Sequence, residues 1–287
     1  MIRIIPRLDV KGPNLVKGIH LEGLRVLGSP EKFAKYYYEN GADELIFQDV
    51  VASLYERNSL HDIISRVAKN IFIPLTVGGG LRTISDIKQV LRAGADKVTI
   101  NTAAIRNPAF VSEASKKFGA STIVIAIEAI KQTNGKYYAF IDNGREETGL
   151  EVVQWARKVE ELGAGEIVIT SVDRDGTGEG FDIELIKQIC SQISIPVIVH
   201  GGASKLENIK IVSDVRGVGG LAIGSIFHYA SFNKLSNGAE LNLEGNKSFL
   251  KRGASYGKIT PMTIENVKSY LNINNIPCRP IIQNQNE

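Results

Sequence analysis

The strongest constraint on the fold of this chain is a repeat whose two copies lie half a chain apart. The first copy, residues 73–101, reads IPLTVGGGLRTISDIKQVLRAGADKVTIN, and the second occupies residues 195–225. Three pairs of positions share a spacing of 122 residues (196 − 74): Pro74 with Pro196, Val77 with Val199, and Gly79 with Gly201. Each copy has a β-branched run, then glycines, then a helix with periodic apolar residues, which is a βαβ pattern. The repeat predicts a chain built from two similar halves.

The glycines of the repeat suggest two anion sites. A glycine after a buried strand lets backbone N–H groups approach an anion at the start of the next helix, where the helix dipole favours negative charge. The alternative interpretation is that residues 78–80 and 201–202 form only tight turns. Because the pattern occurs twice, we favour two phosphate sites.

Composition narrows the class of protein. The 287 residues are 43% hydrophobic, and their net charge of +3 comes from mixed charges, which suits an anionic small molecule rather than nucleic acid or a membrane. Cys190 and Cys278 have no metal-like spacing and suit a reducing compartment. No signal peptide or bilayer-spanning stretch is predicted. We therefore expect a cytoplasmic protein that binds neither nucleic acid nor membrane.

Predicted strands alternate with predicted helices along the whole chain. The strands are expected at residues 3–10, 44–50, two within 73–101, then 122–128, 166–172, 195–200 and 219–224. Charged, glycine and hydroxyl residues collect where these strands end. This pattern predicts one α/β domain over residues 1–287, a (β/α)8 TIM barrel of two similar half-barrels with its site at the C-terminal rim. A doubly wound sheet is the alternative, but it does not predict polar residues after every strand.

Four segments depart from this regular alternation. Residues 11–27 are predicted to form a long polar loop, and residues 131–147 a small hairpin. A polar insertion is expected at residues 231–258, on the active-site side, and a disordered tail at residues 279–287. Asp182 is expected to cap the helix that follows it.

Several motifs carry a resemblance to a known family: RIIPRLDV, VKGIHLEGLR, IPLTVGGGLR, TSVDRDGTGEGFD and GSIFHY. With them the chain closely resembles the cyclase subunits of imidazole glycerol phosphate synthase, over residues 1–229 and again from about residue 260. The resemblance implies a lyase of histidine biosynthesis that uses ammonia from a glutaminase partner, with no cofactor or metal. Its substrate would be a bis-phosphorylated aminoimidazole carboxamide ribonucleotide, converted into imidazole glycerol phosphate and an aminoimidazole carboxamide ribonucleotide.

The resemblance also assigns roles to individual residues. It implies catalytic carboxylates at Asp9 and Glu128, and a loop lysine that closes on substrate at Lys17. One phosphate site is implied at Gly80, Asn101 and Thr102, and the other at Asp175, Gly176, Gly202, Gly224 and Ser225. Asp9 could instead be a strand-end carboxylate that caps backbone groups. Ser225 could be only a helix N-cap, because the two roles look alike in a sequence.

At the opposite end of the barrel, the resemblance implies an ammonia gate formed by four charged residues: Arg3, Glu44, Lys97 and Glu166. All four stand at strand starts. Charges that point into a barrel floor are costly unless they pair with one another, so a closed salt-bridge ring is expected. The alternative is that they are ordinary charges on the bottom rim.

Four inward-facing positions depart from the family pattern. Arg7 replaces a usual Cys, Gln48 a Leu, Glu128 an Asp and His200 a Ser. A guanidinium inside a barrel needs a carboxylate partner, so we expect Arg7 to pair with Asp9, with Glu128 or with both. Arg7 and Gln48 could also fill or polarise the passage for ammonia.

These departures leave alternatives open. The first is a co-adapted enzyme in which the reaction is unchanged. The second is a paralogue that delivers ammonia to another amidotransferase, for instance in surface-sugar biosynthesis. A non-catalytic ligand-binding barrel ranks last, because Asp9 is present.

Overall fold

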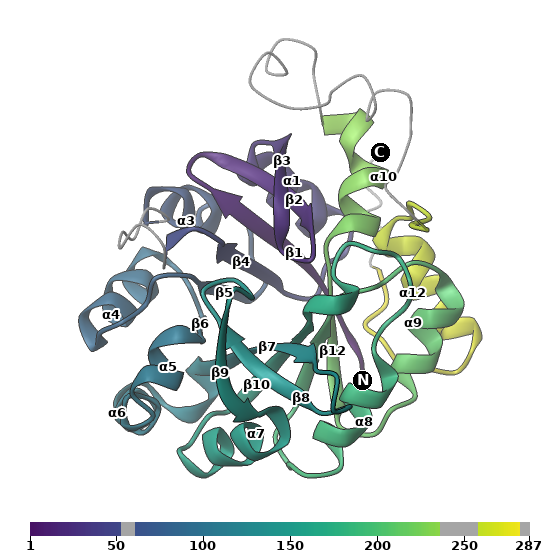
Figure 1. Ribbon diagram of the computed structural model, residues 1–287. Coiled ribbons are helices and arrows are strands. Elements are labelled where there is room, and N and C mark those ends of the chain that lie inside the picture. The colour runs from purple at the N-terminus through teal and green to yellow at the C-terminus, as the bar shows by residue number, and fades with distance from the viewer. Residues whose placement is uncertain (53–60, 236–257, 282–287) are drawn as a thin grey trace.

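The computed structural model describes residues 1–52, 61–235 and 258–281, which form a (β/α)8 barrel (Figure 1). The barrel wall is made of parallel strands: β1 (Arg3–Lys11), β4 (Leu45–Asp49), β5 (Leu75–Gly78), β6 (Lys97–Ile100), β7 (Ile123–Lys131), β10 (Glu166–Ser171), β11 (Val197–His200) and β12 (Val218–Ile223). Pairing of β12 with β1 closes the wall. The predicted barrel is confirmed, since a doubly wound sheet would leave two open edges.

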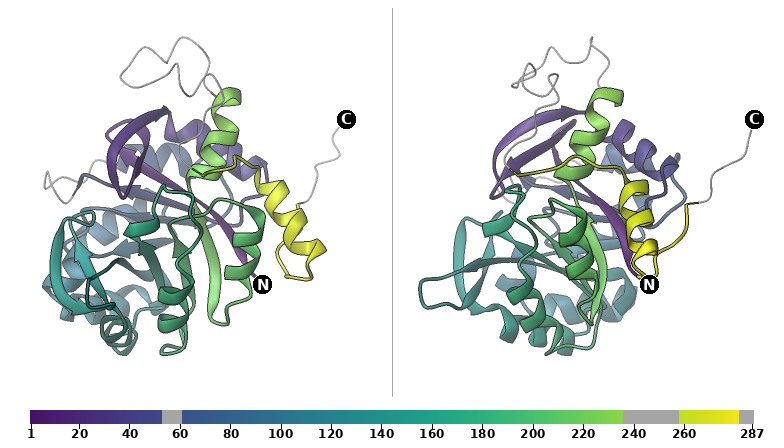
Figure 2. Two further views of the ribbon diagram at one scale, coloured as in Figure 1. Left: turned by 45° about the vertical axis from the view of Figure 1, so that its right-hand side comes forward. Right: turned by 90° about the vertical axis from the view of Figure 1, so that its right-hand side faces the viewer.

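Helices surround this wall in all views (Figures 1 and 2). They are α1 (Pro30–Glu39), α3 (His61–Ala68), α4 (Ile84–Ala93), α5 (Thr102–Arg106), α6 (Ala109–Phe118), α7 (Val152–Glu161), α8 (Ile183–Cys190), α9 (Leu206–Ser213), α10 (Ser225–Leu235) and α12 (Ile264–Ile273). Their inner faces are apolar, as at Trp155 and Val159 of α7. Asp182 caps α8 as predicted, accepting a hydrogen bond of 3.1 Å from the Leu185 N–H. Among the described helices, none is long and apolar enough to cross a membrane.

The predicted repeat is visible in the backbone. Gly79 after β5 and Gly201 after β11 both have a positive φ, 106° and 99°, which an L side chain rarely adopts. Thr83 precedes α4 and Lys205 precedes α9, and the two residues have nearly the same backbone conformation. Thr83 has φ −131° and ψ 158°, and Lys205 has φ −131° and ψ 159°. The two copies therefore share one strand, turn and helix geometry.

Alternate residues of each strand point into the barrel and form layers. A middle layer of six apolar side chains, called the apolar layer below, is buried between polar layers: Ile5, Ile46, Val124, Val168, Ile198 and Ala222. A layer of charged side chains, the floor of the barrel, lies on the side of the strand starts. A cavity with polar side chains, described below, lies on the side of the strand ends. The apolar layer thus separates two polar compartments inside one barrel.

The prediction of a long loop at residues 11–27 is wrong. This segment forms a hairpin of β2 (Asn14–Ile19) and β3 (Glu22–Gly28), and β2 also pairs with β1. Its two-residue turn is His20 and Leu21, with φ of 51° and 61°. Turns of this kind normally carry Asn or Gly at both positions, so the residues here give no turn signal. The hairpin lies beside α10 at the strand-end side of the barrel (Figures 1 and 2).

The second predicted hairpin is present. After β7, the strands β8 (Tyr137–Ile141) and β9 (Glu146–Glu151) extend the sheet, with β7 paired to β8. Of the predicted insertion, residues 231–235 belong to α10 and residue 258 is also described, whereas residues 236–257 lie outside the described residues. Of the predicted tail, Arg279 donates a 2.8 Å hydrogen bond to Asp43, and residues 282–287 lie outside the described residues.

Candidate active site

A cavity of about 260 Å³ opens at the strand-end side of the barrel. Three of the four unusual inward residues line it, namely Arg7, Gln48 and Glu128. The cavity is also lined by all three residues of the first predicted phosphate site, Gly80, Asn101 and Thr102. The structure thus brings one predicted catalytic carboxylate and one predicted phosphate site into the same space.

Arg7 is a buried cation, with 6% of its surface exposed. Its Nε donates a 2.9 Å hydrogen bond to Asp9 Oδ1, and its Nη1 donates a 3.2 Å hydrogen bond to Thr170 Oγ1. The expected carboxylate partner is therefore Asp9. In the described part of the chain Arg7 makes no hydrogen bond to Glu128, although its positive charge acts on that carboxylate.

Glu128 is poised to exchange a proton near neutral pH. Burial raises the pKa of its carboxyl group to about 7, against the opposing effects of the Gly144 N–H and the Arg7 charge. The Gly144 N–H donates a 2.8 Å hydrogen bond to Glu128 Oε2. A buried carboxyl group with this pKa can act as a general acid at physiological pH.

The second predicted phosphate site is also assembled. A small cavity of about 10 Å³ is lined by all five of its residues, Asp175, Gly176, Gly202, Gly224 and Ser225, together with Lys17 and His200. Lys17 Nζ lies 2.9 Å and 3.0 Å from the two Asp175 oxygens. Burial opposes ionisation of Asp175, but Lys17 and His200 outweigh it and hold the Asp175 pKa well below its usual range.

His200 is a buried side chain at this second site. Its Nδ1 donates a 2.9 Å hydrogen bond to the Ala222 carbonyl, and its Nε2 lies 3.3 Å from Asp175 Oδ1 without the alignment of a hydrogen bond. Burial and the Arg7 charge lower the pKa of His200, while Asp175 opposes them. The His200 imidazole thus lines the small cavity beside Asp175.

Two glycines of the second site are required by the fold as well. A Cβ atom on Gly202 would lie 2.2 Å from the Gly180 carbonyl oxygen, and one on Gly176 would lie 2.5 Å from the Gly18 carbonyl oxygen. Both glycines also have a positive φ, 92° and 72°. The tight-turn interpretation therefore holds for Gly202, and it is compatible with an anion site at the same place.

Two polar side chains at this site were not predicted from the sequence. Thr170 holds Arg7, and the inward parity that it shares with Glu166 along β10 could have identified it. Asn143 donates a 2.8 Å hydrogen bond to the Leu21 carbonyl, and its Asn-Gly dipeptide was a detectable turn signal. Thr170 is the first residue of the motif TSVDRDGTGEGFD, whereas Asn143 belongs to no motif on which the family resemblance rests.

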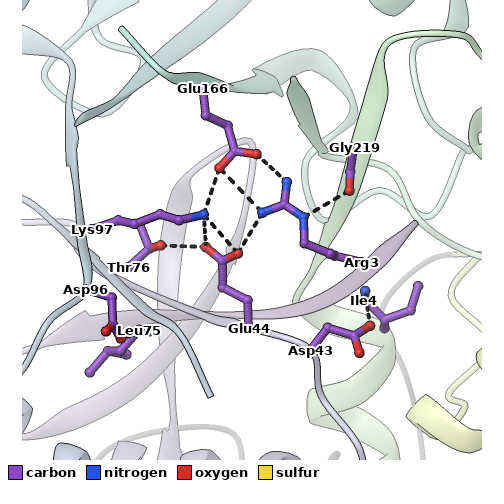
Figure 3. Close-up of polar contacts among 10 residues, drawn as sticks. All are labelled: Arg3, Ile4, Asp43, Glu44, Leu75, Thr76, Asp96, Lys97, Glu166 and Gly219. Carbon is purple, nitrogen blue, oxygen red and sulfur yellow. Dashed lines mark hydrogen bonds and ion pairs between the residues drawn. The ribbon is translucent and has the colours of Figure 1, made fainter. Parts of the chain in front are cut away.

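The four predicted gate residues form a closed ring at the barrel floor (Figure 3). Arg3 pairs with Glu44 at 2.7 Å and also with Glu166, while Lys97 lies 3.2 Å from Glu44 and 3.1 Å from Glu166. Thr76 donates a further 2.6 Å hydrogen bond to Glu44. The Glu44 and Glu166 side chains are only 2% and 7% exposed, so they are not ordinary rim charges.

The chain is similar to known proteins over most of its length. Residues 3–233 match the family described as histidine biosynthesis protein. The imidazole glycerol phosphate synthase subunit HisF of Legionella pneumophila is 57% identical over 209 residues, which cover 73% of this chain and 99% of the relative. The HisF subunits of Alkaliphilus metalliredigens and Lactococcus lactis are each 44% identical over 228 residues, covering 79% of this chain and 90% and 88% of the relatives.

Proposed function

Because this chain belongs to the histidine biosynthesis protein family, among the HisF subunits of imidazole glycerol phosphate synthase, we propose that it catalyses the cyclase reaction of that synthase. It is an enzyme of the lyase class. The substrate is the bis-phosphorylated aminoimidazole carboxamide ribonucleotide, and ammonia is the second reactant. These relatives do not favour the surface-sugar alternative.

The observation that carries this proposal is the position of Arg7 among three carboxyl groups: Asp9, Glu128, which lines the larger cavity, and Asp175, which lines the smaller one. Arg7 holds Asp9 directly at 2.9 Å, and its charge interacts with Glu128 in the larger cavity and with Asp175 in the smaller one. A substrate that bridges the two phosphate sites would therefore pass over Asp9 and Glu128. Cyclisation needs proton transfers at this central part of the substrate.

The two carboxyl groups suit different roles. The Asp9 carboxylate, oriented by Arg7, serves as proton acceptor. Glu128, with its pKa raised to about 7 by burial, serves as proton donor. Such a division follows when two carboxyl groups of one site have different surroundings.

The partner that supplies ammonia is a glutaminase subunit in this proposal. It would dock at the barrel floor, where the ring of Arg3, Glu44, Lys97 and Glu166 surrounds the barrel axis. Ammonia would then cross the apolar layer to reach the cavity. We further place the protein in the cytoplasm, in keeping with its two free cysteines.

The test separates the cyclase reaction from the partner. Purified protein is incubated with the bis-phosphorylated ribonucleotide and concentrated ammonium at mildly alkaline pH, which removes the need for a glutaminase. Imidazole glycerol phosphate among the products supports the proposal. If this product does not form while the protein binds the ribonucleotide, the cyclase reaction is excluded and a role in ammonia delivery gains support.

A further inference from the structure

Two turns from distant parts of the chain meet above the strand ends. One is the tip of the β2–β3 hairpin, His20 and Leu21, and the other joins β8 to β9 and contains Asn143 and Gly144. Asn143 Nδ2 donates a 2.8 Å hydrogen bond to the Leu21 carbonyl. A Cβ atom on Gly144 would lie 3.5 Å from Leu21 Cδ1, so the two turns are also packed together. Leu21 and Asn143 are only 2% and 8% exposed.

Each turn also holds one acidic residue of the candidate site. The Gly144 N–H donates a 2.8 Å hydrogen bond to Glu128, the predicted proton donor. The His20 N–H donates a 2.9 Å hydrogen bond to the Asp175 carbonyl, and the Leu21 N–H a 3.3 Å hydrogen bond to the Asp175 carboxylate. The contact between Asn143 and Leu21 therefore connects the surroundings of two functional carboxyl groups.

We propose that Asn143 is a positioning residue that couples the β2–β3 hairpin to the orientation of Glu128. The hairpin carries Lys17, which reaches Asp175 in the second phosphate site. When the hairpin is docked, the Asn143 amide fixes its own turn, and the next residue presents its N–H to Glu128. Docking of the hairpin and alignment of the proton donor then occur together. This inference rests on the proposed function for the roles of Lys17 and Glu128.

Asn is well suited to this position for two separate reasons. The backbone φ of Asn143 is 63°, a left-handed conformation that Asn and Gly adopt more readily than other residues. Its amide also supplies the donor that the Leu21 carbonyl accepts. Asn143→Gly keeps the backbone conformation and removes the donor. Asn143→Asp keeps the shape but turns an acceptor towards the carbonyl, so the two variants isolate the hydrogen bond.

The first test measures amide hydrogen exchange by mass spectrometry on the full chain without ligand. In both Asn143 variants we expect protection of the peptides that cover residues 17–28 and 141–147 to fall by about tenfold, as for loss of one buried hydrogen bond. Asn134→Gly is the matched control, because Asn134 lies at the exposed β7–β8 turn and contacts Lys136 and Tyr138. Unchanged protection of residues 17–28 in both Asn143 variants would overturn the coupling.

The second test separates positioning from a purely structural role. Several groups face Glu128: the Arg7 guanidinium from β1, the Asn101 side chain after β6, and Asp142 with the Gly144 N–H from the β8–β9 turn. In Asn143→Gly the Gly144 N–H is no longer held in place. The limb of the pH–rate profile that Glu128 controls should therefore move to higher pH, kcat should fall by about tenfold, and KM for ammonia should stay constant.

The outcomes distinguish this inference from the proposed function. If the wild-type chain forms no imidazole glycerol phosphate, the proposed function fails, but hydrogen exchange still decides whether Asn143 couples the two turns. If the wild-type chain is active and Asn143→Gly leaves both kcat and the pH–rate profile unchanged, the positioning role is refuted.

Discussion

Arg7 determines the chemistry of its neighbours at the scale of single residues. It is one buried cation among three carboxyl groups, Asp9, Glu128 and Asp175. Arg7 donates a hydrogen bond from Nε to Asp9 and another from Nη1 to Thr170. Lys17 forms an ion pair with Asp175. Glu128 is left without an ion pair in the described part of the chain, so burial dominates its pKa. The arginine thus pairs directly with one carboxyl group, while burial raises the pKa of another against the effect of the arginine charge.

The first prediction concerns Asp9→Asn. Turnover should fall by about 10²- to 10⁴-fold, because the amide cannot accept a proton. Affinity for the ribonucleotide should change little, since the variant keeps the size of the side chain and an oxygen that Arg7 can contact. Steady-state kinetics and calorimetric binding would measure both quantities, with Asp62→Asn on the exposed surface of α3 as control. A loss of affinity as large as the loss of rate would argue against a catalytic role for Asp9.

The second prediction follows from the raised pKa of Glu128, about 7 in the folded protein against an ordinary value of 4.5. The folded chain keeps the Glu128 proton to higher pH than the unfolded chain, so the bound proton stabilises the folded state. This stabilisation is fully present below about pH 4.5 and is lost as the pH rises through 7. Glu128→Gln cannot ionise and should escape this loss. Urea denaturation should show the variant gaining about 3 kcal/mol over wild type between pH 4.5 and 8. An equal pH dependence in both proteins would refute the raised pKa.

At the scale of elements, the regular part of the fold was predictable and the strand-end connections were less so. Buried strands and helix periodicity mark the βαβ units, and inward parity correctly directed Arg7 towards Asp9. The β2–β3 hairpin was missed because its turn is His20 and Leu21, whose positive φ values are held by contacts with Asp175 and Asn143. Such contacts come from distant parts of the chain, so local sequence could not reveal them.

The third prediction compares two glycines of the second predicted phosphate site. Gly202→Val should weaken substrate binding and also lower thermal stability, because its Cβ would lie 2.2 Å from a backbone oxygen. Gly224→Ala should leave stability nearly unchanged, since its Cβ would meet no atom closer than 3.5 Å, yet it narrows a cavity of only about 10 Å³. Thermal melts and ribonucleotide titration of both variants check this. Unaltered affinity in a folded Gly224→Ala protein would remove Gly224 from the anion site.

At the scale of the whole molecule, the barrel holds three compartments along one axis. The charged ring forms the floor, the apolar layer lies above it, and the cavity with Arg7 and Gln48 opens at the far end. Gln48 accepts a 3.1 Å hydrogen bond from Thr99, so the inner wall of the cavity is polar on more than one strand. Arg7 and Gln48 therefore line the path of any molecule that would pass from the floor through the apolar layer into the cavity.

The fourth prediction is that Arg7 restricts ammonia arriving from the partner side. Arg7→Cys removes a long buried side chain and should raise glutamine-dependent activity relative to ammonia-dependent activity, when both are measured with the glutaminase present. Because the variant also releases Asp9, both absolute rates are expected to change, and the ratio of the two rates is the informative quantity. Arg106→Cys, at the exposed rim of the same cavity, is the control and should leave the ratio at the wild-type value. An unchanged ratio in Arg7→Cys would show that the arginine does not obstruct the passage.

The apolar layer has a consequence for which of two species, ammonia or ammonium, could cross the barrel. An ion that crosses it must give up its hydration, at a cost of several kcal/mol, whereas a neutral amine gives up far less. If ammonia crosses the barrel as proposed, these six buried hydrocarbon side chains would act as a dielectric filter that favours neutral ammonia over ammonium. Under the proposed function, an ammonium ion would have to lose its proton before it enters this layer.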